Sequence, residues 1–98
     1  MNAQKWLLDQ IQQYRDDPVF VAEQLIIEIN EEICRQMAQE NVNRAELARR
    51  LGVTRQFITK LLNGNPNLTV LTLVKIAVAL GARVKMNFIS GETPAHLK

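Results

Sequence analysis

The chain has 98 residues, of which 47% are hydrophobic and 22% charged, and its formal net charge at pH 7 is +2. This length allows one domain with a single modest core, and this hydrophobic fraction excludes a disordered chain. No apolar run approaches the roughly 20 residues of a membrane span, and the N-terminus lacks the features of a signal peptide. The single cysteine, Cys34, excludes an internal disulfide and fits a reducing cytoplasm.

Charge is divided unevenly along the chain. Residues 1–42 carry three basic and eight acidic side chains, a net charge of −5, whereas residues 43–98 carry nine basic and two acidic ones, a net charge of +7. The positive half is the half that the phosphates of a nucleic acid would attract. The acidic half is expected to face solvent or a partner protein.

Two helices are predicted before residue 41. Residues 3–15 show an amphipathic pattern, whose apolar members are Trp6, Leu7, Leu8, Ile11 and Tyr14. Asp17 can cap a second helix that has Pro18 at its first position. This helix is predicted over residues 18–40, with one bend or break. Cys34 lies on its apolar side and is expected to be an inert buried thiol.

Residues 43–64 contain two short helical patterns joined at a glycine. Asn43 is placed to cap the first helix, and Glu46 three residues later completes a pair like a capping box. Gly52 ends this helix because the turn requires a positive φ, and Thr54 caps the next helix. The apolar residues of the two helices are spaced to face inward: Leu47, Ala48, Leu51, Ile58, Leu61 and Leu62.

The remainder of the chain is predicted to contain a helix, followed by a segment in which apolar and polar residues alternate. A helix is predicted over residues 69–80, and residues 82–90 then alternate apolar Val84, Met86 and Phe88 with polar residues, which predicts a β-strand. A lone strand cannot satisfy its own backbone groups, so it must pair with a second copy or with an unrecognised segment. Pairing with the same strand of a second copy is preferred, and these three apolar residues are the predicted dimerisation surface. Residues 91–98 are predicted to be a flexible tail.

The stretch 43–64 resembles the lambda-repressor-like (Xre-type) helix-turn-helix family, and the similarity extends through residues 65–81. The resemblance implies a mainly α fold, a helix-turn-helix bundle with an added N-terminal helix and one C-terminal β-strand. The domain organisation that it implies is an N-terminal helix (1–17), an Xre-type domain (18–81, helix-turn-helix 44–63), a strand (82–90) and a tail (91–98). Leu62 departs from the family, where many members have glutamate, so this helix end is expected to pack more tightly.

The resemblance also implies sequence-specific binding of duplex DNA, usually by a dimer. The predicted base-contacting residues are Arg55, Gln56, Thr59 and Lys60, with Phe57 as a further base-edge contact. The predicted phosphate-contacting residues are Asn43, Arg44 and Asn63. Two other arginines of the motif, Arg49 and Arg50, are expected to be solvated or paired within the protein.

Several functions are compatible with these patterns. The preferred one is a dimeric transcriptional repressor that reads a palindromic operator through the major groove. An alternative is an antitoxin that binds a toxin through its acidic N-terminal region and represses its own operon. An interaction module that has lost DNA binding would not require the exposed arginines and glutamine. An ordinary helical hairpin would not account for the similarity that continues into the next helix. The sequence lacks a phosphate-binding loop, a metal-ligand cluster and a nucleophile–base pair, so neither an enzyme nor a cofactor is expected.

Overall fold

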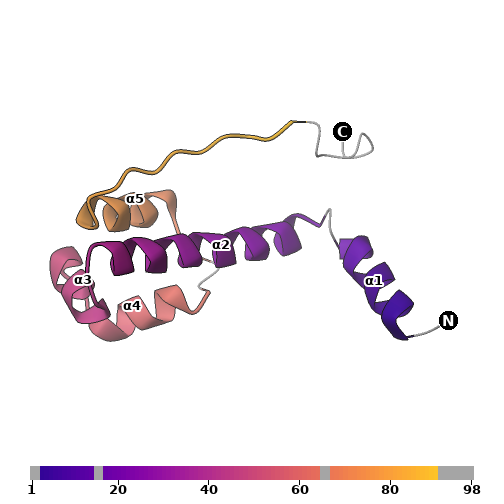
Figure 1. The fold of residues 1–98 in the computed structure, drawn as a ribbon, viewed down its shortest axis with the longest axis horizontal. Helices are drawn as coiled ribbons and strands as arrows, with labels where there is room; N and C mark the ends of the chain where they lie inside the picture. The colour runs from indigo at the N-terminus through magenta and orange to yellow at the C-terminus, as the bar shows by residue number, and fades with distance from the viewer. Residues whose placement is uncertain (1–2, 15–16, 65–66, 91–98) are drawn as a thin grey trace.

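The computed structural model describes residues 3–14, 17–64 and 67–90, through which five helices run (Figure 1). The helices are α1 (Ala3–Tyr14), α2 (Pro18–Gln39), α3 (Arg44–Leu51), α4 (Arg55–Leu62) and α5 (Val70–Ala79). Helices α3, α4 and α5 gather around the C-terminal half of α2, and α1 lies beyond its N-terminal end (Figure 1). The mainly helical fold expected from the sequence is thereby confirmed. Among the described residues, no helix is both long and apolar enough to cross a bilayer.

The start of α2 follows from its first residues. Asp17 Oδ1 accepts a hydrogen bond from the Val19 backbone N at 2.8 Å, and Pro18 occupies the start of the helix, where no helical partner is needed for its nitrogen. The helix then runs without interruption to Gln39, so it does not break at any point. The physical reason is the absence of proline and glycine from the interior of this helix.

A core of nine buried hydrophobic residues holds the C-terminal half of α2 against the other three helices. Its members are Ile33, Met37, Val42, Leu47, Ala48, Ile58, Leu61, Ile76 and Leu80. Leu47 of α3 and Ile58 of α4 are both 0% exposed, so the two helices of the predicted motif meet at the centre of this core. Leu62 also packs against it. Burial of these side chains holds α3 and α4 together.

Two side chains of α2 differ from what the sequence analysis expected. Cys34 is exposed, so its prediction as a buried thiol is wrong. Ile33 and Met37, four residues apart, both face the core. Cys34 directly follows Ile33, so its side chain is rotated by about 100° around the helix axis, away from the core. Asn30 is buried, and its Oδ1 has no hydrogen-bond partner among the described residues, a feature that the sequence pattern did not reveal.

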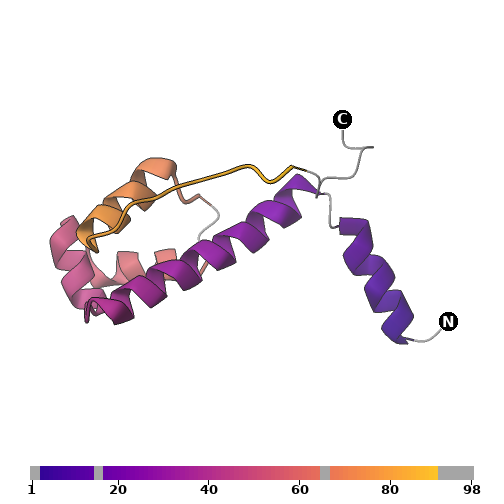
Figure 2. The same ribbon diagram turned by 45° about the horizontal axis from the view of Figure 1, so that its top comes forward.

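The predicted β-strand over residues 82–90 is not present in the described part of the chain. After Gly81, which has a φ of +71°, this segment runs back over α5 toward the N-terminal end of α2 without strand pairing (Figures 1 and 2). A strand is defined by its hydrogen-bonded neighbour, and the described residues of one chain supply none. Val84, Met86 and Phe88 are all exposed. The predicted tail, residues 91–98, lies outside the described residues, as do the side chains of Leu8, Ile11 and Tyr14.

Candidate nucleic-acid interface

The turn between α3 and α4 is built by side chains and backbone angles that the sequence predicted. Asn43 Oδ1 accepts a hydrogen bond from the Glu46 backbone N at 2.8 Å, which caps α3. Gly52 is left-handed with a φ of +69°, and the Val53 backbone N donates to the Ala48 carbonyl oxygen at 3.0 Å. Thr54 Oγ1 accepts from the Phe57 backbone N at 3.1 Å and caps α4. These contacts confirm the predicted caps and the predicted glycine turn.

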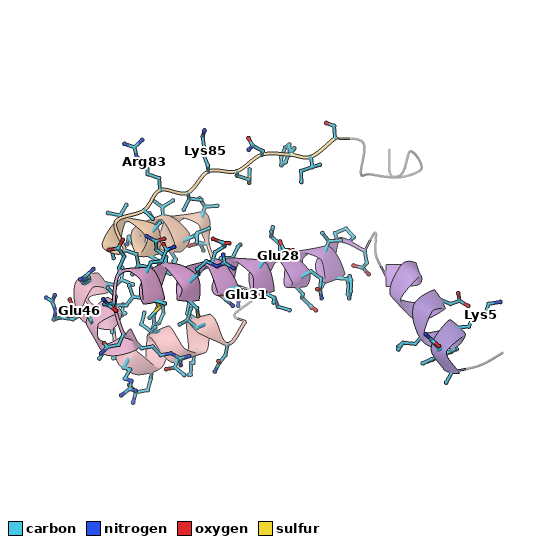
Figure 3. All side chains as sticks on the ribbon, in the orientation of Figure 1. Lys5, Glu28, Glu31, Glu46, Arg83 and Lys85 are labelled. Carbon is cyan, nitrogen blue, oxygen red and sulfur yellow. The ribbon has the colours of Figure 1, made fainter. Side chains whose placement is uncertain are left out.

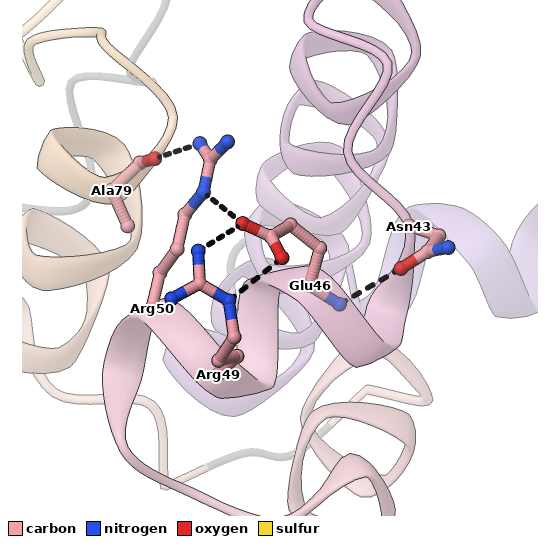
Figure 4. Close-up of polar contacts among 5 residues, drawn as sticks. All are labelled: Asn43, Glu46, Arg49, Arg50 and Ala79. Atoms are coloured by element: carbon pink, nitrogen blue, oxygen red, sulfur yellow. Dashed lines mark hydrogen bonds and ion pairs between the residues drawn. The ribbon is translucent and has the colours of Figure 1, made fainter.

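The carboxylate of Glu46 has a different role from the expected capping box. Instead of returning to Asn43, it accepts hydrogen bonds from Arg49 Nε at 2.8 Å and from Arg50 Nε at 2.9 Å (Figure 4). These bonds, that of Arg49 first, lower the pKa of Glu46 from 4.5 to about 2. The same contact raises the pKa of Arg49. The expectation that Arg49 and Arg50 are paired is therefore confirmed, and their charge is partly offset by Glu46.

The end of α5 is held by side chains from two other helices. Arg50 Nη1 donates to the Ala79 carbonyl oxygen at 2.8 Å, and Gln36 Nε2 donates to the Leu80 carbonyl oxygen at 3.3 Å. Both carbonyls lie at the helix C-terminus, where no helical N–H can reach them. Helix α5, and with it the start of the 82–90 segment, is thus fixed against α3 and α2.

The predicted base-contacting residues share α4 but differ in accessibility. Arg55, Gln56 and Lys60 are exposed, on a helix whose Ile58 is fully buried. Phe57 is 44% exposed, so it is also open to solvent on this helix. Their exposure leaves the polar surface of α4 open to a ligand. Their individual contacts with bases stay predictions.

Thr59 and Arg44 are joined in a way that the sequence did not indicate. Arg44 Nη1, from the first residue of α3, donates to Thr59 Oγ1 of α4 at 3.3 Å, and both residues are half-buried. The two lie 15 positions apart and share no local pattern, so no signal in the sequence could have found the contact. Of the remaining predicted phosphate contacts, Asn43 caps α3 and Asn63 follows the last residue of α4. All three phosphate roles stay predictions.

Part of the positive charge lies away from α4. Arg83 and Lys85 belong to the 82–90 segment and point away from α2 (Figure 3). Beneath this segment lies a groove of about 610 Å³ between α2 and α5, and its apolar lining includes Leu25, Ile29, Leu73, Ile76 and Val84. Helix α4 does not line this groove. Within the described part of the chain, no group of histidine, cysteine and carboxylate side chains is arranged to hold a metal ion.

A comparison with protein families finds a helix-turn-helix in the same part of the chain. Residues 33–85 match a family model described as "Helix-turn-helix". This range is more than half of the 98 residues and contains α3, α4, α5 and the C-terminal end of α2. The comparisons with curated proteins and with solved structures found no match.

Proposed function

This chain belongs to the lambda-repressor-like (Xre-type) helix-turn-helix family, a family of DNA-binding regulators, and from that premise we propose that it binds specific sequences of duplex DNA. The observation that carries the proposal is the exposed polar surface of α4. Arg55, Gln56 and Lys60 all project from a helix that is capped by Thr54 and anchored by a fully buried Ile58. A rigid helix with a polar outer face is the element that such proteins place in the major groove.

The size and chemistry of α4 suit this role. An α-helix with its side chains is about 10–12 Å across, so the eight-residue helix α4 can enter the major groove, which is roughly 12 Å wide. Arginine and lysine side chains pair best with guanine O6 and N7, and glutamine pairs with adenine N6 and N7. We therefore assign base recognition to Arg55, Gln56 and Lys60, and a thymine methyl contact to Phe57.

Affinity would come mainly from the DNA backbone. The proposed phosphate contacts are Asn43 and Arg44 at the start of α3 and Asn63 at the end of α4. Arg49 and Arg50 contribute less, because Glu46 already offsets part of their charge. Binding should weaken as salt rises, since each arginine or lysine that neutralises a phosphate releases condensed counterions.

Two copies would act together on a palindromic operator. In the 82–90 segment, Met86 is 75% exposed and Phe88 is 91% exposed. Apolar side chains exposed next to one another often mark a surface that binds another protein. We propose that this segment, with Val84, pairs with its counterpart in a second copy and forms a two-fold dimer. Half-sites would then lie about one DNA turn apart, and an occupied operator that overlaps a promoter would repress transcription in the bacterial cytoplasm.

A second candidate function is that of an antitoxin. The N-terminal half of α2 exposes Val19, Leu25 and Ile27 alongside the carboxylates of Glu23 and Glu28. An apolar and acidic helix surface is suited to a basic partner protein, such as a nuclease toxin. Capture of one small basic protein by the full chain, from the native host, supports this function. Loss of that capture in a Leu25→Lys variant places the contact on α2.

The principal experiment is the selection of bound duplexes from a random pool with the full chain. The expected result is enrichment of a two-fold symmetric sequence with a constant spacing between its halves. Arg55→Ala should abolish enrichment at specific positions, whereas Lys75→Ala removes a positive charge from the exposed surface of α5 and serves as the matched control. A pool that is not enriched in any sequence would contradict sequence-specific binding.

A further inference from the structure

Thr59 differs from the other polar residues predicted to contact bases. Arg55, Gln56 and Lys60 are exposed, whereas Thr59 is half-buried. Its Oγ1 already accepts a hydrogen bond from Arg44 Nη1 at 3.3 Å. The hydroxyl of Thr59 is therefore directed toward α3.

Arg44 in turn differs from the other two arginines of α3. In the described part of the chain, Arg49 and Arg50 both pair with Glu46, whereas no carboxylate pairs with Arg44. A guanidinium has five N–H donors, and Thr59 takes up one of them. The charge of Arg44 and its other donors thus stay available to an anion. The phosphate oxygens of DNA are acceptors that suit this planar group.

We propose that Thr59 is a positioning residue that holds Arg44 against α4 and aims its guanidinium at a DNA phosphate beside the recognition helix. The proposal rests on the proposed DNA binding. An arginine that is already held loses less side-chain freedom when it meets a phosphate, so the Thr59 hydroxyl strengthens binding to every sequence. Thr59 then governs affinity, and base discrimination is left to its exposed neighbours on α4.

The test is a double-mutant cycle on the full chain, with a selected operator duplex and a panel of its single-base variants. Thr59→Val removes the hydroxyl and keeps the branched shape, whereas Thr59→Ser keeps the hydroxyl. Thr59→Val should weaken binding to all duplexes by a similar factor of about 3–10, and Thr59→Ser should bind like the wild type. Arg44→Met should reduce the slope of log K against log salt by about 0.9, the value for one phosphate contact.

The decisive observation is the effect of Thr59→Val when Arg44 is already methionine. The proposal expects no further loss, because the hydroxyl acts through Arg44. An equal loss in both backgrounds would overturn it, because Thr59 would then act independently of Arg44. A loss confined to one base pair would also overturn it and make Thr59 a direct base contact. Arg49→Met is the matched control, since Glu46 already pairs with Arg49, and it should change the salt slope less than Arg44→Met. If the wild type binds no duplex at all, the proposed DNA binding fails. Equal losses in the two backgrounds, in a protein that does bind, contradict only the role of Thr59.

Discussion

Arg50 joins the first helix of the motif to the last helix of the domain through the Ala79 carbonyl oxygen. Its Nη1 donates to that oxygen at 2.8 Å, and its Nε donates to Glu46 at 2.9 Å (Figure 4). Ala79 is the last residue of α5, so its carbonyl has no helical donor. The Arg50 guanidinium therefore supplies a hydrogen-bond donor at the C-terminus of α5 and fixes the position of α5 relative to α3.

Replacement of Arg50 should destabilise the domain more than replacement of its neighbour. Arg50→Ala removes the bond to Ala79 as well as the contact with Glu46, so we expect the free energy of unfolding to fall by about 1 kcal/mol. Arg49→Ala, the matched control, removes only an ion pair whose arginine side chain is 71% exposed, and should lower the free energy of unfolding little or not at all. Urea unfolding measures both, and equal losses would contradict a structural role for the bond to Ala79.

Glu46 should make the stability of the protein depend on pH. Hydrogen bonds from Arg49 and Arg50 lower its pKa in the folded state from 4.5 to about 2. Because the folded pKa is the lower one, this stabilisation is fully present above about pH 4.5 and is lost as the pH falls toward 2.

Thermal unfolding of a Glu46→Gln variant checks this dependence. Its melting temperature should be slightly below that of the wild type at neutral pH, and the difference should disappear by about pH 2, the folded-state pKa. Glu28→Gln corrects for the general loss of one negative charge. A difference that stays constant down to pH 2 would show that the pairing does not titrate as expected.

Gly52 should resist substitution for a reason confined to the backbone. Its φ is +69°, and a Cβ at this position would have no described heavy atom of a residue beyond its two chain neighbours within 4 Å, so the cost of a side chain is conformational and not steric. We expect Gly52→Ala to lower the free energy of unfolding by about 1–2 kcal/mol. Gly52→Asn should lower it less, because asparagine enters the left-handed region more readily. Denaturant unfolding of both variants tests this order, and an equal or larger loss for asparagine contradicts it.

Gln56 should contribute to discrimination between bases and not to stability. Its side chain is exposed on α4, so Gln56→Ala should leave the melting temperature unchanged. Competition binding with single-base operator variants should show a loss of about 1–3 kcal/mol of discrimination at one base pair. Lys75→Ala is the control for a general loss of side chain. Unchanged operator preference in Gln56→Ala would remove this residue from the base contacts.

Phe88 should stabilise the proposed dimer. It is 91% exposed, and Phe88→Asp would place a charge on the surface that we expect to be buried between two copies. Sedimentation equilibrium should show association at least about tenfold weaker than in the wild type. Asn87→Asp introduces the same charge on the alternate, polar side of the segment and should associate normally. A wild-type chain that is monomeric at micromolar concentration contradicts the dimer.

The features that the sequence predicted correctly depend on residues close to one another in the chain. Asn43 and Thr54 cap the helices that follow them, since each side chain reaches a backbone N–H three residues ahead. Gly52 ends α3 because its conformation is a property of the residue itself. The spacing of apolar residues likewise indicated which sides of α3 and α4 face the core. Short-range geometry of this kind is encoded by neighbouring residues and needs no knowledge of the rest of the fold.

The features that the sequence did not reveal depend on contacts between distant segments. The bond from Arg44 to Thr59 and the bond from Arg50 to Ala79 exist only because packing of the core brings separate helices together. The exposure of Cys34 follows from which side of α2 the other helices cover. Segment 82–90 has the alternation of a strand, but pairing needs a neighbour. The sequence by itself therefore determined the helix-turn-helix unit. Only the tertiary structure decided which polar side chains stay free to meet DNA, because that depends on which of them the fold already pairs.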